Sequence, residues 1–321
     1  MTRGSRQYWP HRRAARRLPR LRPKPHFGEV SKISNIVGFK AGMTSMTVID
    51  DSESLSKQQE IERACTIVEI PDMELYGIRL YKKDKLTSYP AVSTEIYNRS
   101  IAEKLKMKKI KNDESKINAI KDHISEYSDV SALIVAYPST TAIEQKHVVR
   151  FESHIRGKSA KEKFEFLSSQ LGKPVTTEHV FKNGEYIDVV SISVGKGWAG
   201  VIKRYGVARL PHKSSQKIRH VGTLGDYGTG RVLYSVPQAG QMGFNYRTEK
   251  NKRILKLGSK SNVSEINKKG GIMNYGVLKN NYVVIDGSIP GPSKRLVRLR
   301  ESNGRLNKRG IKEPKIISVN M

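Results

Sequence analysis

The sequence predicts a mainly β protein with an inserted α/β region, a basic N-terminal arm and a long basic central loop. Short apolar runs bounded by glycine or proline recur along the chain, which is typical of β strands. Helical spacing of apolar residues is concentrated in residues 98–180. The 321 residues include 59 Lys or Arg against 30 Asp or Glu, a formal net charge of +29. This length suggests about two domains, and the surplus charge indicates a polyanionic partner.

Residues 1–35 are expected to form the extended basic arm. Residues 1–28 contain nine Arg or Lys and no acid. Prolines in this stretch oppose the amphipathic helix that an organelle transit peptide needs, and the apolar core of a secretory signal is missing. The alternatives are a solvated, disordered tail and an arm that becomes ordered on RNA, and we prefer the arm. Its candidate phosphate-binding residues are Arg3, Arg6, Arg12, Arg13, Arg16, Arg17, Arg20 and Arg22.

Residues 36–97 are expected to form the first part of the β domain. Gly38–Thr44 predicts a glycine-bounded turn that leads into a strand at Ser45–Asp50. Two further apolar runs, Arg63–Ile70 and Leu75–Tyr81, are expected to be strands of one sheet. The single cysteine, Cys65, is expected to be a small core residue. One cysteine forms no internal disulfide, which fits a reducing, intracellular compartment.

Residues 98–180 differ in character and predict the α/β insertion. Isoleucines at helical spacing indicate a helix near residues 117–124, and Ser131–Tyr137 is expected to be a buried strand. A capping box at Ser159–Glu162 begins a second helix, which Gly172 ends. Residues 101–130 balance seven Lys against six acids, which indicates a solvated surface and not the main RNA contact.

Residues 181–321 are expected to form the second part of the β domain, with strands at Tyr186–Val194, Arg231–Val236, Tyr282–Asp286 and Arg295–Arg300. We expect the last of these at a sheet edge that faces phosphate. Between the first two lies a basic loop, residues 195–231. Positions 195–225 hold seven Lys or Arg and no acid, too polar for a core and too long for an ordinary connection.

Gly195–Gly200 matches the G-x-G-x-x-G pattern of dinucleotide-binding folds. The following residues contain Gly206 and Pro211, lack helical apolar spacing and supply no acid at the end of a strand about twenty residues on. We therefore expect these glycines to let the backbone approach phosphates closely. Trp198 is expected either to stack on bases or ribose or to pack in the core, with the two alternatives equally open.

The sequence predicts neither a catalytic site nor a metal or cofactor site. The eight histidines are scattered without the spacing of zinc ligands. No apolar stretch approaches the ~18 residues of a membrane span. We expect no membrane partner and no small-molecule substrate. Two alternatives stay open: a DNA-binding, chromatin-like protein, and an RNA-modifying enzyme supported only by Gly195–Gly200.

Four blocks of the sequence resemble the signature of the large-subunit ribosomal protein three family. The central block places Asp188, Ser191, Ser193, Gly195–Gly197, Gly200 and Arg204 at fixed distances after Phe181. The other three are Phe39–Thr44, Gln238–Lys252 and Gly287–Arg295. The insertion and the ending of the last block, with Gly291-Pro292 and Lys294-Arg295, are similar to the archaeal and eukaryotic branch.

The resemblance implies a six-stranded β-barrel of the translation-protein type, with an arm and a central loop that run through rRNA toward the peptidyl-transferase centre. It implies a structural, non-enzymatic constituent of the cytoplasmic ribosome that supports assembly beside neighbouring large-subunit proteins. The loop tip would contain Gly225, Asp226 and Tyr227, where many relatives place Trp. Beyond the arm, the expected rRNA-binding residues are Lys40, Lys196, Trp198, Lys203, Arg204, Arg209, Lys213, Lys217, Arg219, Arg231, Gln238, Gln241, Arg247, Asn251, Lys252, Lys294 and Arg295.

Overall fold

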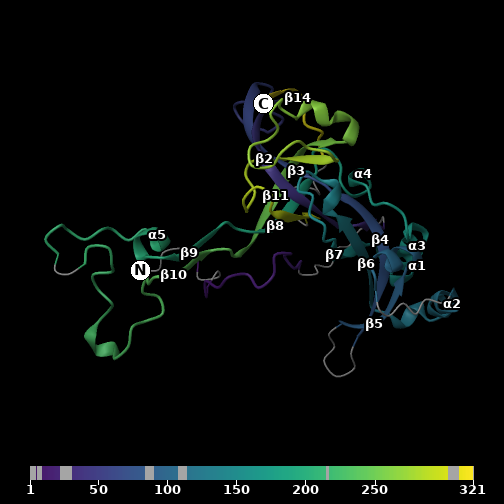
Figure 1. The fold of residues 1–321 in the computed structure, drawn as a ribbon, viewed down its shortest axis with the longest axis horizontal. Helices are drawn as coiled ribbons and strands as arrows, with labels where there is room; N and C mark the ends of the chain where they lie inside the picture. Colours follow the sequence, from purple (N-terminus) through teal and green to yellow (C-terminus); the bar gives the residue numbers. More distant parts are fainter. Residues whose placement is uncertain are drawn as a thin grey trace.

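The computed structural model describes residues 5, 9–21, 31–83, 90–107, 114–214, 217–302 and 311–320. It is mainly β, as the sequence predicts. A body built from two sheets and short helices carries one long excursion, residues 195–243, on one side (Figure 1). The arm residues Arg3, Arg6 and Arg22 lie outside the described residues. In the part of the chain that is described, no helix is both long and apolar enough to cross a membrane.

The first sheet has seven strands whose pairing closes on itself. Strand β13 pairs with β8 on one side and with β2 on the other, so the order returns to its start after six strands, and β14 extends β2. We call it the closed sheet. Its order is β13 (Leu296–Glu301), β8 (Tyr186–Ile192), β11 (Tyr246–Gly258), β12 (Tyr282–Asp286), β3 (Glu60–Glu69), β2 (Asn35–Ile49) and β14 (Ile316–Asn320).

Strands β8, β12 and β13 confirm three of the predicted strands, but three other expectations for this region are wrong. Gly38–Thr44 is no turn and continues β2 through a bulge. A Cβ on Gly38 would lie 2.6 Å from Val68 Cγ1, so this glycine serves close strand packing. Arg231–Val236 forms no strand. Strand β13 is no edge, because both of its sides are paired.

The second sheet has five strands. Its order is β1 (Lys32–Ile33), β7 (Val149–Arg156), β6 (Asp129–Tyr137), β4 (Asp72–Lys83) and β5 (Pro90–Tyr97). Two of them, β4 and β5, come from residues 36–97, which are expected to form the first part of the β domain. The expectation that Arg63–Ile70 and Leu75–Tyr81 share a sheet is therefore wrong. The chain passes from β3 in the closed sheet through Pro71 to β4 in this one.

Short helices accompany the five-stranded sheet. Helix α3 (Ala160–Gln170) packs against β6 and confirms Ser159 as its N-cap, because the Ser159 hydroxyl accepts a hydrogen bond from the Glu162 backbone amide at 3.2 Å. Its Phe164 and Leu167 are buried. The body also contains the short helices α1 (Arg99–Lys104), α2 (Glu114–Asp122), η2 (Ile124–Glu126), η3 (Pro138–Thr140), α4 (Thr177–Val180) and, beside the closed sheet, η5 (Lys260–Glu265).

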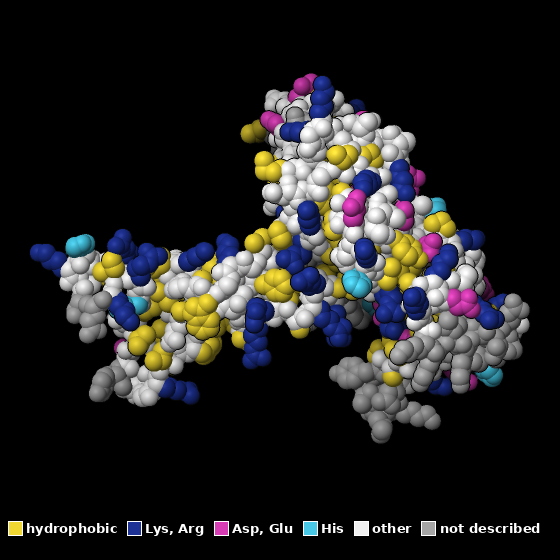
Figure 2. Space-filling model, viewed as in Figure 1, with side chains coloured by type: hydrophobic (Ala, Val, Ile, Leu, Met, Phe, Trp, Pro, Cys, Tyr) yellow, Lys and Arg dark blue, Asp and Glu magenta, His cyan; other side chains and the backbone are white. Residues whose placement is uncertain are grey.

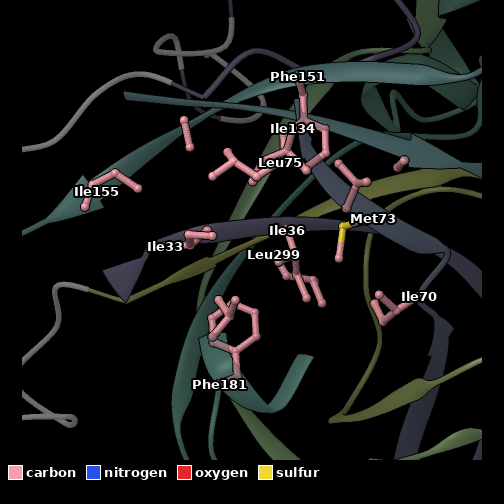
Figure 3. Packing of buried hydrophobic residues seen from close by; sticks show 14 of the residues in the cluster. Ile33, Ile36, Ile70, Met73, Leu75, Ile134, Phe151, Ile155, Phe181 and Leu299 are labelled. Atoms are coloured by element: carbon pink, nitrogen blue, oxygen red, sulfur yellow. The ribbon is translucent and has the colours of Figure 1, made fainter. Parts of the chain in front are cut away.

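One apolar cluster joins the two sheets into a single body. Ile36 and Leu299 of the closed sheet and Leu75 and Ile134 of the five-stranded sheet belong to it (Figure 3). Phe181, just after α4, fills the same cluster. Burial of apolar surface on this scale dominates folding stability. Cys65 is fully buried in a second cluster, as predicted, and burial raises the pKa of its thiol to about 12.

Candidate nucleic-acid interface

The excursion starts as a two-stranded ribbon that leaves the body at β8 and returns at β11. Strand β9 (Gly195–Ala199) pairs with β10 (Gly240–Gly243), and Trp198 lies opposite Gln241. The Trp198 side chain is 80% exposed, so the core-packing alternative is wrong. An exposed indole beside the exposed Lys196 is a surface on which a nucleobase can stack.

Arg204 holds the base of the excursion together. It lies in α5 (Val201–Tyr205), and its Nη1 and Nε donate to the carbonyls of Gln238 at 2.7 Å and Gln241 at 3.2 Å. A Cβ on Gly240 would lie 2.8 Å from Arg204 Nη1, so a larger residue at this position would displace the guanidinium. This predicted RNA contact therefore has a structural role within the protein. Gln238 and Gln241 take part through their main-chain oxygens.

The described part of the arm lies along the base of the excursion and runs toward the body (Figure 1). Hydrogen bonds that use arm main-chain atoms fix it there. The Ala14 amide donates to Phe244 O at 2.8 Å, Asn245 Nδ2 donates to Arg12 O at 2.8 Å, and the Tyr246 hydroxyl donates to Arg20 O at 2.6 Å. The arm is thus docked on its own protein and keeps its arginine side chains for other partners.

Apolar and basic side chains of the arm differ in burial. Ala14 and Leu18 are half-buried and Pro19 is buried, and Leu18 packs against the main apolar cluster. The arginines are exposed: Arg12, Arg13, Arg16, Arg17 and Arg20. The docked arm therefore presents a row of guanidinium groups to solvent.

An aromatic cluster closes the junction of arm and excursion. The Trp9 ring lies 5.9 Å from that of Tyr234 and 6.2 Å from that of Tyr205, centroid to centroid. The His11 ring lies 5.5 Å from Trp9 and 6.1 Å from Tyr205. Burial lowers the pKa of His11, and the nearby guanidinium groups of Arg204 and Arg247 lower it further. A positive charge on His11 is therefore disfavoured in the docked arm.

Positive charge covers the rest of the excursion. Residues 195–243 contain a single acid, Asp226. Figure 2 shows Lys and Arg side chains along the excursion, whereas most of the visible acids lie on the body. The exposed cations beyond the ribbon are Lys203, Arg209, Lys213, Lys217, Arg219 and Arg231. Such a projection is suited to a polyanion, because each phosphate that it neutralises releases counterions.

Comparison with known proteins identifies the family. The family model described as ribosomal protein L3 matches residues 2–318. The chain belongs to this family. It is 37% identical to large ribosomal subunit protein uL3 of Methanococcoides burtonii, over 99% of this chain and 96% of that protein. The protein of the same name from Methanocorpusculum labreanum is 35% identical over 99% and 96%, and that from Methanosphaera stadtmanae is 36% identical over 93% and 90%.

In this L3-family chain, Gly195–Gly200 belongs to the antiparallel ribbon and the start of α5. Every strand pairing in the described residues is antiparallel. A dinucleotide-binding fold needs parallel strands around its glycine-rich turn. The motif therefore lacks the structural context that would support a nucleotide site.

The expected loop tip of this L3-family chain lies on the excursion, away from the body (Figure 1). Tyr227–Thr229 forms the single turn η4, with Asp226 as its N-cap. Gly225 and Gly230 have φ angles of +121° and +60°, which favour glycine over other residues. These glycines therefore set the sharp path of the chain on both sides of Tyr227.

The structure contradicts a surface role for Lys40. This side chain is 8% exposed, and its Nζ donates to Ile289 O at 2.7 Å and Gly291 O at 3.1 Å. Burial lowers the pKa of Lys40. Lys40 therefore ties β2 to the turn that precedes β13, and it joins two of the family blocks.

Four other predicted contacts divide between two places. Lys294 is exposed and Arg295 is half-buried over the Phe244 ring, 5.1 Å from its centroid, so both lie beside the docked arm. Asn251 and Lys252 lie at the β11 bulge, where Asn251 Oδ1 accepts from Ser302 at 2.7 Å and Lys252 Nζ pairs with Glu249 at 3.1 Å. Asn251 and Lys252 thus have partners within the protein.

The sequence did not single out Trp9, His11, Phe244, Asn245 or Tyr246 as parts of this interface. Tyr246 and Asn245 lie inside a recognised family block, which was a signal. Trp9 and His11 lie in a stretch whose many basic residues already account for its predicted role as an RNA-binding arm. Their partners lie about 200 residues away in sequence, so no local pattern reveals them.

Proposed function

We propose that this chain is a structural constituent of the large subunit of the cytoplasmic ribosome and that it binds and stabilises large-subunit rRNA beside neighbouring large-subunit proteins. Its relatives carry the name of a large ribosomal subunit protein. The observation that carries the proposal is the excursion with the docked arm, in which exposed cations project from a folded body.

The closed sheet serves as the rigid base in this proposal. We take its ring of six strands as the barrel of the translation-protein type, with the five-stranded sheet as part of the inserted region. A closed sheet exposes no long edge and resists deformation. It therefore holds the arm and the excursion at fixed positions against the RNA surface.

The arm and the excursion are proposed to enter the rRNA and neutralise phosphates that would otherwise repel one another. Arginine forks bind phosphate oxygens bidentately, and lysine acts as a mobile point charge. Trp198 adds a stacking surface for an unpaired base. This role needs no acid, base or metal from the protein, and it supports early assembly of the subunit.

The loop tip at Gly225, Asp226 and Tyr227 is proposed to lie near the peptidyl-transferase centre. Replacing Tyr227 with Ala removes the aromatic ring, and we expect subunits to assemble but to translate more slowly or to respond differently to drugs that bind this centre. Tyr227→Trp keeps an aromatic face and is the matched control. Translation rate and drug sensitivity of purified ribosomes measure the effect, and normal behaviour of the Ala variant in both assays would remove the tip from the proposal.

Sedimentation of cell extracts tests the central claim. We expect the chain to co-migrate with large subunits and to leave them only as the salt concentration rises, since phosphate contacts weaken with salt. Migration with chromatin would favour the DNA-binding alternative. Migration as free protein at low salt would contradict ribosome binding and leave an RNA-modifying enzyme to consider.

A further inference from the structure

A groove of about 520 Å³ lies where the arm, the ribbon and the turn before β13 meet. Four basic side chains from separate segments line it: His11 of the arm, Lys196 of β9, Arg204 of α5 and Arg247 of β11. The other described residues that line the groove are neutral. No acid is among the described lining residues, although the chain as a whole contains 30.

The walls of this groove are fixed by the fold. The backbone amide of Asn245 donates to Ser193 Oγ at 3.1 Å, while its side-chain Nδ2 donates to Arg12 O of the arm. Gly243 has a φ of +71°, and a Cβ there would lie 2.0 Å from Val194 O. The ribbon can therefore leave the closed sheet at this angle only with glycine at this position. A pocket that is built before its ligand arrives loses less entropy on binding.

Basic groups from three other segments line the groove together with His11. Arg204 lies on α5, Arg247 on β11 and Lys196 on β9, and the aromatic rings of Trp9 and Tyr205 lie beside the His11 ring. Arg204 already donates to two carbonyls. Among the described lining residues no carboxylate balances the positive potential in the groove, which is the arrangement of an anion site.

We propose that this groove binds one phosphate group of an RNA backbone, which Lys196 and Arg247 neutralise and to which His11 donates a hydrogen bond. This assignment rests on the proposed function and deepens it. Because His11 belongs to the arm and Lys196 to the excursion, one phosphate would connect both segments. RNA binding at this point then stabilises the docked arm, and a docked arm strengthens RNA binding by the same free energy.

Nuclear magnetic resonance of the full chain with labelled histidines tests the groove directly. His11→Gln identifies the His11 signal, and a pH titration then gives the midpoint of His11 protonation. Inorganic phosphate and a short oligouridylate are the two probes, with chloride at equal ionic strength as reference. An anion beside an imidazole favours its charged form, so we expect both probes to shift the His11 midpoint upward.

Two variants decide whether the response belongs to this groove. Lys196→Gln and Arg247→Gln are expected to reduce the upward shift, and the double variant to abolish it. Lys161→Gln, an exposed residue of α3 on the body, removes the same charge elsewhere and should leave the shift unchanged. No shift with either probe, or an equal shift in the double variant, would overturn the assignment. A response to inorganic phosphate but not to the oligouridylate would exclude an RNA backbone as the ligand.

Co-sedimentation with large subunits, measured on the same preparations, separates the two proposals. A chain that co-sediments but shows no His11 shift contradicts the groove alone. A chain that shows the shift but never joins large subunits contradicts the proposed function alone.

Discussion

Several basic residues of this L3-family protein turn their charge inward, toward main-chain oxygens. Arg298 is 5% exposed, and its guanidinium donates to Asn35 Oδ1 at 2.8 Å, Glu152 O at 2.6 Å and Pro19 O at 3.3 Å. Burial lowers the pKa of Arg298 to about 10. One residue of β13 thus joins the arm, the closed sheet and the five-stranded sheet. A basic residue in this protein is therefore not by itself evidence of an RNA contact.

Lys40→Met tests this inward role. The change removes the donor for two carbonyls and leaves them buried, which costs about 1–3 kcal/mol in the free energy of unfolding. Denaturant unfolding of the RNA-free chain measures this loss. Lys294→Met, at an exposed site nearby, is the matched control and should change stability by less than about 0.5 kcal/mol. Unchanged stability of Lys40→Met together with weaker RNA binding would restore Lys40 as a surface contact.

The sequence could identify exposed cations, because stretches without acids and rich in Gly, Pro and Ser cannot form a core. It could not separate Lys40, Arg298 and Arg300 from them. Arg300 pairs with Asp188 at 2.7 Å, and both side chains are buried. In the sequence, Arg295–Arg300 mixes basic and apolar residues, which resembles an edge strand. Only the burial of Arg298 and Arg300, each 5% exposed, shows that these side chains point into the protein.

At the scale of elements, local patterns predicted single strands and helices but not their partners. The strands β6, β8, β12 and β13 and the helix α3 follow from apolar runs and a capping box within a few residues. Sheet membership depends on contacts across long sequence distances. Local patterns therefore place β4 in the same sheet as β3, which is wrong, and nothing in 195–243 predicts that Gly195 and Gly243 pair in a ribbon.

Gly240→Ala tests how the ribbon is held. The new Cβ would lie 2.8 Å from Arg204 Nη1 and displace a guanidinium that makes two hydrogen bonds. We expect amide hydrogen exchange in β9 and β10 to become about tenfold faster, since a loss of 1.4 kcal/mol has that effect, while the closed sheet exchanges as before. Gly200→Ala is the matched control, because its Cβ meets nothing within 4 Å. Equal effects of both changes would show that Arg204 does not hold the ribbon.

At the scale of the whole molecule, the docked arm links the excursion to the body, and His11 makes this link sensitive to pH. Burial lowers the pKa of His11 in the docked arm below its ordinary value of 6.5. The undocked arm therefore binds more protons below about pH 6.5, so docking is stable above that pH and weakens as the pH falls.

Fluorescence of Trp9 measures this loss of docking. In a Trp198→Phe chain, Trp9 is the remaining tryptophan, and we expect iodide to quench it more strongly as the pH falls from about 8 to 5. His11→Gln in the same background should make quenching independent of pH over this range. A pH response that persists without His11 would assign the effect to another group.

The docked arm also has a consequence for how the molecule is made. Arm residue Arg12 is held by Asn245, which is 233 positions later in the chain. Synthesis proceeds at roughly 5–20 residues per second. The arm is therefore made tens of seconds before the residues on which it docks. During that interval its guanidinium groups can bind any nucleic acid nearby. The nascent chain is therefore most prone to non-specific nucleic-acid binding until Asn245 has been synthesised.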